Sequence, residues 1–227
     1  MHSSNVTTIV SGLPRTGTSM MMKMLEAGGI PVLADNIREA DEDNLGGYYE
    51  LEKVKEIKDD TAWLDGARGK VFKMVSMLLY DLPADREYAV VFMERDLSEV
   101  LASQRKMLER MGKPVSDEDD SKTRALYEKH LAEIKEWLRN QGNFSVLFLK
   151  YNDVINDPSG AAAMLDGFLG RGLDVDRMAA VANPELYRNR AGALAAASPS
   201  PAAELPSGDE EEDEEAIKER LKGLGYM

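Results

Sequence analysis

The sequence contains no cysteine and only two histidines, His2 and His130, among its 227 residues. The lack of cysteine excludes disulfide bonds, thiolate nucleophiles and thiolate zinc sites, and the scarcity of histidine excludes a histidine-rich metal centre. No apolar run reaches membrane-spanning length, and the N-terminus has no basic segment followed by a hydrophobic stretch. We therefore expect a cytoplasmic protein, without a membrane partner or a metal ion, whose chemistry depends on carboxylates, hydroxyls and cations.

The net charge of −13 argues against a nucleic-acid polymer as partner, because such polymers are anionic and bind to basic protein surfaces. Seven of the negative charges lie in the acidic run 209–215, which leaves −6 on the rest of the chain. Basic residues in this mildly acidic remainder can still bind a small anion.

Short apolar segments alternate with amphipathic segments along the first 190 residues. The pattern predicts strands at 6–11, 70–75, 88–94 and 145–149. It predicts helices at 18–27, 97–111, 119–140, 158–169 and 174–182. On the third of these helices, His130 shares the apolar face and is expected to be packed. Such alternation is typical of a three-layer α/β/α fold with a central parallel sheet, in which ligands bind at the carboxyl ends of the strands.

Composition divides the chain into three parts. Residues 1–190 form the expected domain, and residues 191–215, which are rich in Ala, Pro and Ser and then acidic, are expected to form a flexible linker. Residues 216–227 are expected to form a short C-terminal helix or tail, with Ile217, Leu221 and Leu224 packing on the body.

One loop is built for an anion: Leu13-Pro14-Arg15-Thr16-Gly17-Thr18-Ser19 joins the first strand to the first helix. With Gly12 and Gly17 it fits the phosphate-binding Walker pattern, except that Thr18 stands where that pattern has lysine. The amides at the start of the helix would face the anion. Nucleoside-triphosphate enzymes use the missing lysine on the terminal phosphates, so the loop predicts a phosphate site that lacks the usual triphosphate contact. An ordinary glycine-rich strand-to-helix turn is the alternative.

Taken with three further segments, the loop resembles that of the P-loop sulfotransferases, which use 3′-phosphoadenosine 5′-phosphosulfate (PAPS) as donor. The resemblance covers roughly residues 6–190 and lies in the combination and order of the motifs. It implies that the 5′-phosphosulfate is held by Pro14, Arg15, Thr16, Gly17, Thr18 and Ser19. Because this donor is a phosphosulfate and not a triphosphate, the resemblance explains why Thr18 stands in place of the Walker lysine.

The other motifs imply the rest of the donor site. Arg95 at a strand end and Ser103 eight residues later match the family's 3′-phosphate motif, and Tyr151, in Tyr-Asn-Asp-Val-Ile-Asn-Asp-Pro, is similar to the residue that contacts the adenine side. Arg188 and Arg190 stand where the family commonly adds basic contacts, although the Arg-Lys-Gly run of the cytosolic enzymes is missing. Taken singly, each of these side chains also has an ordinary structural interpretation.

The catalytic base is the point where this sequence departs from the family. Many members carry Lys-x-His on a strand, but here Lys73 is followed two residues later by Val75. Other branches are understood to use a glutamate, which implies Glu50, in Gly-Tyr-Tyr-Glu, as base, with Glu39 and Asp41 as rivals. Lys73 and Arg15 are then expected beside the reacting sulfuryl group.

The sequence thus predicts a sulfotransferase that moves a sulfuryl group from PAPS to a hydroxyl or amine of a small-molecule, carbohydrate or peptide acceptor. The alternatives are a P-loop kinase of small molecules, which Thr18 disfavours, and a non-catalytic nucleotide-binding module, which the missing histidine leaves open. The sequence does not indicate the acceptor or the oligomeric state.

Overall fold

The computed structural model describes residues 6–35, 49–113, 116–182 and 210–227. The chain divides into two compact units. The first unit consists of Met1–Arg95 and Arg139–Leu186, and the second of Asp96–Leu138 and Tyr187–Met227. The expected single domain, residues 1–190, therefore contributes to both units.

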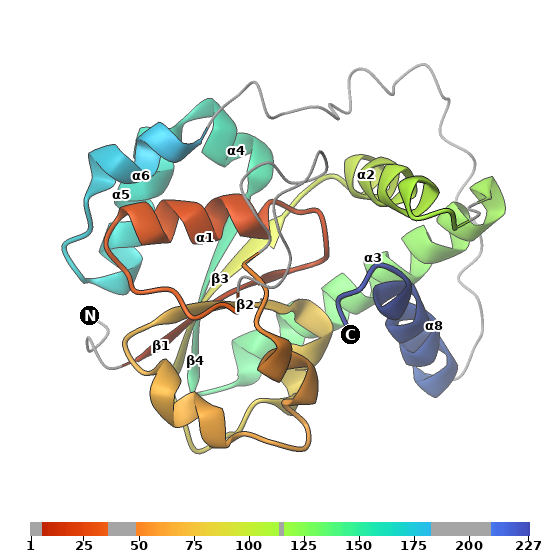
Figure 1. Ribbon diagram of the computed structural model, residues 1–227, viewed down its shortest axis with the longest axis horizontal. Coiled ribbons are helices and arrows are strands. Elements are labelled where there is room, and N and C mark those ends of the chain that lie inside the picture. The colour runs from red at the N-terminus through yellow and green to blue at the C-terminus, as the bar shows by residue number, and fades with distance from the viewer. Residues whose placement is uncertain (1–5, 36–48, 114–115, 183–209) are drawn as a thin grey trace. The chain divides into compact units, whose positions relative to one another are not determined.

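A four-stranded parallel sheet forms the centre of the first unit (Figure 1). Its strands are β1 (Thr7–Gly12), β2 (Val71–Val75), β3 (Tyr88–Glu94) and β4 (Phe144–Lys150), in the order β2-β1-β3-β4. Every residue of β1 and β2, and all of β3 except Glu94, is buried, and burial on both faces explains the continuous apolar run 89–93 of β3. The predicted strands are confirmed to within one residue at each end. The α/β class with a central parallel sheet is likewise confirmed.

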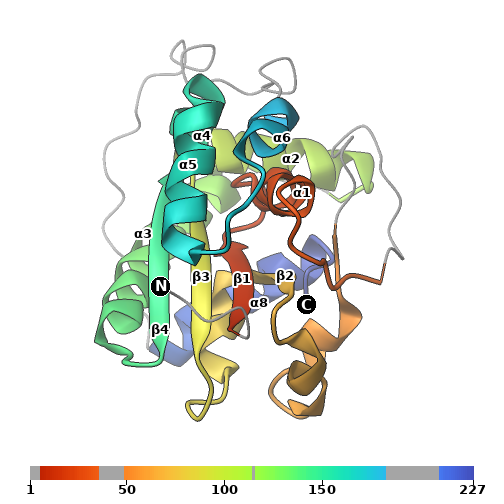
Figure 2. The ribbon, with the colours of Figure 1, turned by 90° about the vertical axis from the view of Figure 1, so that its left-hand side faces the viewer.

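Helices of the first unit pack together along the sheet (Figure 2). They are α1 (Thr18–Ala27), α4 (Tyr151–Asn156), α5 (Pro158–Leu169) and α6 (Val175–Val181). Helix α1 contacts β1, β2 and α6, and α5 contacts β4, α4 and α6. Local chemistry sets these helix ends: Asp157 caps α5 by accepting a hydrogen bond from the Gly160 amide, and Pro158 is at its first position.

The described residues of the first unit also form three short 3-10 helices: Glu52–Glu56, Ala62–Ala67 and Ser76–Asp81. The sequence pattern did not predict them, nor α4, because segments of about one or two turns show too few apolar repeats for a periodicity to be recognised. The Arg171 guanidinium adds a long-range contact by donating to the carbonyls of Gly69 (2.9 Å) and Val6 (2.7 Å).

The second unit contains α2 (Leu97–Arg110), α3 (Asp117–Asn140) as far as Leu138, and α8 (Glu210–Gly223). Asp96 caps α2, as its sequence pattern predicts, by accepting from the amides of Ser98 and Glu99. Helix α2 ends at Arg110, one residue before the end of the expected helix 97–111, and Met111, its C-cap residue, is 46% exposed.

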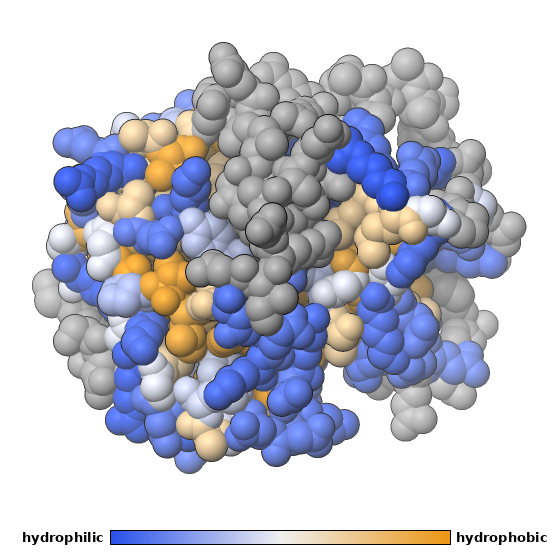
Figure 3. Space-filling model, in the orientation of Figure 1, coloured by the Kyte–Doolittle hydropathy of each residue, from blue (hydrophilic) through white to orange (hydrophobic). Residues whose placement is uncertain are grey.

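Helix α8 begins earlier than expected. Residues 210–215, which we expected to belong to the linker, form its first turns, and the rest of that linker up to residue 209 lies outside the described residues. Ile217, Leu221 and Leu224 are buried, as predicted. In the described part of the chain, no helix has both the length and the hydrophobicity that crossing a bilayer requires. The surface that Figure 3 colours is largely hydrophilic, in keeping with 30% charged residues.

Candidate functional site

The loop between β1 and α1 depends on two glycines that no other residue can replace without rearrangement. Gly12 has φ 142° and Gly17 has φ 96°, both in the region that side chains disfavour. A Cβ atom at Gly12 would lie 2.5 Å from the carbonyl oxygen of Met93, and one at Gly17 would overlap the Tyr151 ring. The sequence therefore needs glycine at both positions because neighbouring chain segments approach the loop closely.

The loop is held in shape by its own polar groups. The Thr16 hydroxyl donates to the Leu13 carbonyl (2.7 Å), and the Thr16 amide donates to the same oxygen (3.3 Å). Thr16 is buried, whereas Arg15, at φ 77°, adopts a left-handed conformation that is uncommon for a side-chain-bearing residue. Such strain at a loop is typical of functional sites.

The loop ends at the N-terminus of α1. Gly17 is its N-cap residue and supplies no capping side chain, and the first turn contains no acidic residue. The first amides of a helix have no partner inside the helix, and its dipole favours an anion there. Thr18 and Ser19 are the first two residues of α1. The local structure thus has the form of an anion-binding loop.

Arg95 and Tyr151 meet beside this loop. Arg95 directly follows β3, and its Nη1 donates to the Arg15 carbonyl (3.1 Å), while its Cζ lies 4.4 Å from the centroid of the Tyr151 ring. Tyr151 directly follows β4, is only 6% exposed, and packs against Gly17. Three strand ends of the parallel sheet therefore bring together the loop, Arg95 and Tyr151, which are part of the predicted donor site.

A buried ion pair lies at β2. Lys73, in β2, is 6% exposed, and its Nζ lies 3.9 Å from Oε1 of Glu50, whose side chain is 13% exposed. Lys73 lies opposite Val10 of the neighbouring strand β1, two residues before β1 ends at Gly12. Two of the three expected catalytic side chains, which are 23 residues apart in the sequence, thus form an ion pair.

Backbone contacts fix the position of Glu50. Its carbonyl accepts from the Asp35 amide (2.8 Å), and the Asp35 carboxylate accepts from the Glu52 amide (2.7 Å). The preceding residue, Tyr49, has φ 51°, and its hydroxyl donates to Oε2 of Glu26 on α1 (2.6 Å). Burial and the Glu26 carboxylate raise the pKa of Tyr49, so its hydroxyl stays protonated. Sequence reasoning missed these contacts; the only available signal was the unusual Gly-Tyr-Tyr-Glu sequence.

The other predicted site residues belong to the second unit or lie outside the described residues. Ser103 is buried in α2, in the second unit. Arg188, Arg190, Glu39 and Asp41 lie outside the described residues. Among the residues that the structure describes, no three His, Cys, Asp or Glu side chains are grouped so that they could hold a metal ion.

Comparison with known proteins identifies the family. The model of the sulfotransferase domain family matches residues 6–189, which is most of the chain. The chain therefore belongs to the sulfotransferase domain family, and the predicted class, a sulfotransferase, is confirmed. The family match gives no support to the kinase alternative. No curated protein sequence matches the chain.

Solved structures of sulfotransferases are among those similar to the chain. The sulfotransferase domain from the curacin biosynthetic pathway is 14% identical, with a TM-score of 0.48 and 98% of each chain covered. The sulfotransferase domain of the Synechococcus PCC 7002 olefin synthase is 15% identical, with a TM-score of 0.46, over 96% of this chain and 94% of that one. Retinol dehydratase in complex with androsterone and the inactive cofactor PAP is 17% identical, with a TM-score of 0.42, over 95% and 80%.

Proposed function

We propose that this protein transfers a sulfuryl group from PAPS to a hydroxyl or amine acceptor. The observation that carries the proposal is the meeting of the loop, Arg95 and Tyr151 at one edge of the sheet. This edge offers helix amides, a guanidinium and an aromatic ring, which are groups suited to a phosphate and a purine base. It does so in a loop without the Walker lysine, as expected for a phosphosulfate and not for a triphosphate.

The donor's two phosphates would be held by different groups. The loop from Pro14 to Ser19 would hold the 5′-phosphosulfate through its amides, with the Thr18 and Ser19 hydroxyls as further donors. Arg95 would bind the 3′-phosphate, and Ser103 is assigned to the same phosphate from its place in the motif. Arg188 and Arg190 are kept as further contacts on sequence grounds alone.

Glu50 and Lys73 would carry the transfer step. In that step, the acceptor oxygen or nitrogen forms a bond to sulfur as the bond from sulfur to the bridging oxygen breaks. The acceptor's proton passes to Glu50, and the electron pair of the broken bond stays on the 5′-phosphate, where the positive charges of Lys73 and Arg15 stabilise it. The Lys73–Glu50 pair supports this assignment because it holds a buried base and a cation side by side. Glu39 and Asp41 remain the alternative bases.

The acceptor's class and the location of the protein follow from the sequence alone. We propose a small-molecule, carbohydrate or peptide acceptor, because no basic surface for a nucleic acid is expected from the charge of −13. The cytoplasmic location also stays a proposal. The division into a domain, a linker and a C-terminal segment also stays a proposal, with α8 beginning at Glu210.

Ligand-dependent thermal stability tests the donor. We expect adenosine 3′,5′-bisphosphate to raise the melting temperature, and ATP at the same concentration to have a much smaller effect, because a ligand that binds only the folded state stabilises it. Stabilisation by ATP alone would overturn the proposal.

Transfer of labelled sulfate from PAPS to a panel of phenols, alcohols, amines and sugars tests the reaction. We expect turnover with at least one acceptor class and its loss in Glu50→Gln. Bisphosphate binding without turnover across the panel would instead support the non-catalytic module.

A further inference from the structure

The stretch that ends at Asp35 is attached to β2. The Leu33 amide donates to the Val71 carbonyl (2.8 Å), and the Val71 amide donates to the Pro31 carbonyl (2.9 Å). Val71 is the first residue of β2, the strand that also contains Lys73. Asp35, two residues beyond Leu33, therefore extends from a backbone that is fixed to the strand of the proposed catalytic cation.

Asp35 holds the chain on the C-terminal side of the proposed base. Its amide donates to the Glu50 carbonyl (2.8 Å), and its carboxylate accepts from the Glu52 amide (2.7 Å). Both hydrogen bonds act on peptide groups that follow the Cα atom of Glu50. The direction of the Glu50 side chain also depends on the backbone before that atom, which these two bonds do not reach.

Tyr49 holds the chain on the N-terminal side of the proposed base. It has φ 51°, a left-handed conformation that residues other than glycine rarely adopt. Its hydroxyl donates to Oε2 of Glu26 on α1 (2.6 Å), and such a short bond to a carboxylate is stronger than a bond between neutral groups. The chain is thus held on both sides of Glu50, whose carboxylate lies 3.9 Å from Nζ of Lys73.

The location of Glu26 points to a specific use of its contact with Tyr49. Glu26 is the second-last residue of α1 and is exposed, and the helix dipole disfavours a negative charge at this end. The last turn of α1 contains no basic residue that would offset this charge. A carboxylate at this position weakens the helix, but it supplies an ionised acceptor for the Tyr49 hydroxyl.

We propose that Tyr49 is a positioning residue for Glu50, held by Glu26 at the end of the helix whose N-terminus receives the donor. This inference rests on the proposed function, which assigns Glu50 as the base, and it lies within the first unit. Helix α1 then serves the reaction at both ends, because its first turn belongs to the anion-binding loop and its last turn anchors the base. A displaced base slows proton transfer but leaves the donor's contacts intact.

Two substitutions in the full chain remove the same hydrogen bond from opposite sides. Tyr49→Phe removes the donor and Glu26→Ala removes the acceptor. We expect each to lower kcat about three- to tenfold, the range that the net free energy of one hydrogen bond allows, with the affinity for adenosine 3′,5′-bisphosphate unchanged. Initial rates with PAPS and isothermal titration with the bisphosphate measure the two quantities. Glu26→Gln keeps an acceptor for the hydroxyl and should retain kcat.

Combined variants show whether the two residues act together and through the base. Tyr49→Phe with Glu26→Ala should be no slower than the slower single variant, because both changes remove one bond. Tyr49→Phe should cause no further loss in Glu50→Gln. Glu26→Ala also separates positioning from stability: the melting temperature should change little while kcat falls, because removal of a negative charge from the end of α1 offsets the lost bond.

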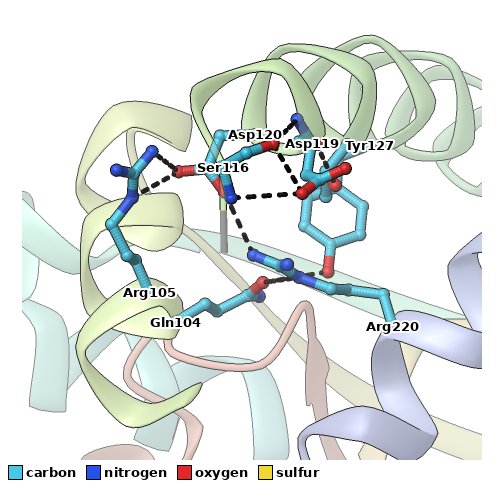
Figure 4. A network of polar contacts seen from close by, with 8 residues as sticks. Gln104, Arg105, Ser116, Asp119, Asp120, Tyr127 and Arg220 are labelled. Atoms are coloured by element: carbon cyan, nitrogen blue, oxygen red, sulfur yellow. Dashed lines mark hydrogen bonds and ion pairs between the residues drawn. The ribbon is translucent and has the colours of Figure 1, made fainter. Parts of the chain in front are cut away.

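Tyr127→Phe is the matched control, because it removes a tyrosine hydroxyl from a polar network in the second unit (Figure 4). The buried Tyr127 donates to Oε1 of Gln104 (3.1 Å). The same oxygen accepts from Arg220 of α8 (3.4 Å), and Arg220 shares the Asp120 carboxylate of α3 with Arg105 of α2. We expect Tyr127→Phe to lower the melting temperature and to leave kcat at saturating PAPS unchanged.

A merely structural role of Tyr49 gives different results. Equal losses of kcat in Tyr49→Phe and Tyr127→Phe, or full kcat in Tyr49→Phe when Glu50→Gln is inactive, would overturn the inference. If Glu50→Gln keeps its activity, the proposed base is wrong, and if the unsubstituted protein turns over no acceptor, the proposed function fails. In either case hydrogen exchange tests the positioning by itself: faster exchange of the Asp35 and Glu52 amides in Tyr49→Phe supports it, and unchanged exchange overturns it.

Discussion

The Arg95 guanidinium lies on the face of the Tyr151 ring, with its Cζ atom 4.4 Å from the ring centroid. The same guanidinium donates to the Arg15 carbonyl, and the ring packs against Gly17. One pair of side chains thus connects the ends of β3 and β4 to the loop that follows β1. A partly desolvated cation–π contact of this kind contributes about 1–2 kcal/mol to the stability of the fold. This contribution does not depend on whether the guanidinium also binds a ligand.

Replacing Arg95 tests the donor site most directly. We expect Arg95→Ala to weaken adenosine 3′,5′-bisphosphate binding by about 1.5–3 kcal/mol, roughly ten- to a hundredfold, because it removes a charged hydrogen bond. Isothermal titration measures the change. Arg177→Ala is the control, since the Arg177 side chain is 77% exposed and its ion pair, with Asp174, is local. Unchanged affinity in Arg95→Ala would refute its assignment to the 3′-phosphate.

Substitution of glycine in the loop separates steric overlap from backbone strain. Gly17 and Gly29 have similar φ angles, 96° and 101°, but an added Cβ would overlap Tyr151 at Gly17 and meets nothing within 4 Å at Gly29. Both alanine variants therefore bear the cost of a positive φ, about 1 kcal/mol, whereas only Gly17→Ala disturbs the loop. We expect Gly17→Ala to be the less stable variant in denaturant and to lose bisphosphate binding.

The result for Gly17 has its own check. Tyr151→Ala combined with Gly17→Ala removes the overlap, so the double variant should be less destabilised than the sum of the two single variants. Equal effects of Gly17→Ala and Gly29→Ala would show that the ring does not restrict the loop.

Neutralising Glu50 tests the proposed base. We expect Glu50→Gln to lower kcat by about 10²- to 10⁴-fold, the usual contribution of a general base, while bisphosphate affinity stays unchanged. Initial rates with PAPS and the best acceptor measure this. Glu52→Gln is the matched control, because Glu52 lies two residues away, its side chain is 48% exposed, and it forms a local ion pair with Lys55. If kcat survives in Glu50→Gln, Glu39→Gln and Asp41→Asn are the next variants to measure.

The burial of His130 predicts that the folded protein loses stability in mild acid. It is 3% exposed, and burial lowers its pKa from 6.5 to about 4, an effect that Glu214 partly opposes. The unfolded chain therefore binds a proton below pH 6.5 that the folded protein accepts only near pH 4. The stability from this group is fully present above pH 6.5 and is lost as the pH falls toward 4.

Urea unfolding at pH 7 and pH 5 measures this effect. We expect His130 to account for about 2 kcal/mol of the decrease in the free energy of unfolding between these two pH values. His130→Gln, which has no titrating group there, should show a correspondingly smaller decrease. Equal decreases in the two proteins would mean that His130 is solvated.

Sequence periodicity was sufficient for most of the fold. The four strands and the longer helices are encoded by runs and repeats of apolar residues that lie close together in the chain, so local patterns predict them. Asp96 and Asp157 were likewise recognisable as helix caps, because a cap acts on the two or three residues that follow it. The short 3-10 helices and α4 were missed because they contain too few residues for a repeat.

The candidate site was also predictable from the sequence only in part. The types of residue at positions 15, 17, 95 and 151 were recognisable from motifs, because the chemistry of binding a phosphate demands a glycine-rich loop and a cation. Which side chains touch was not recognisable. Nothing in the sequence indicates that Arg95 binds the Arg15 carbonyl, that Tyr49 reaches Glu26, or that Asp120 is shared between two other helices.

The sequence by itself determined the order of the elements, the family, and the residues available for binding a donor, because each of these depends on residues near one another in the chain. Only the tertiary structure decided that Glu50 lies 3.9 Å from Lys73, and that α8 holds α2 through Arg220. These pairs join residues 23 and 116 positions apart. Such pairs form when packed elements bring distant segments together, and local periodicity carries no information about which distant segments will meet.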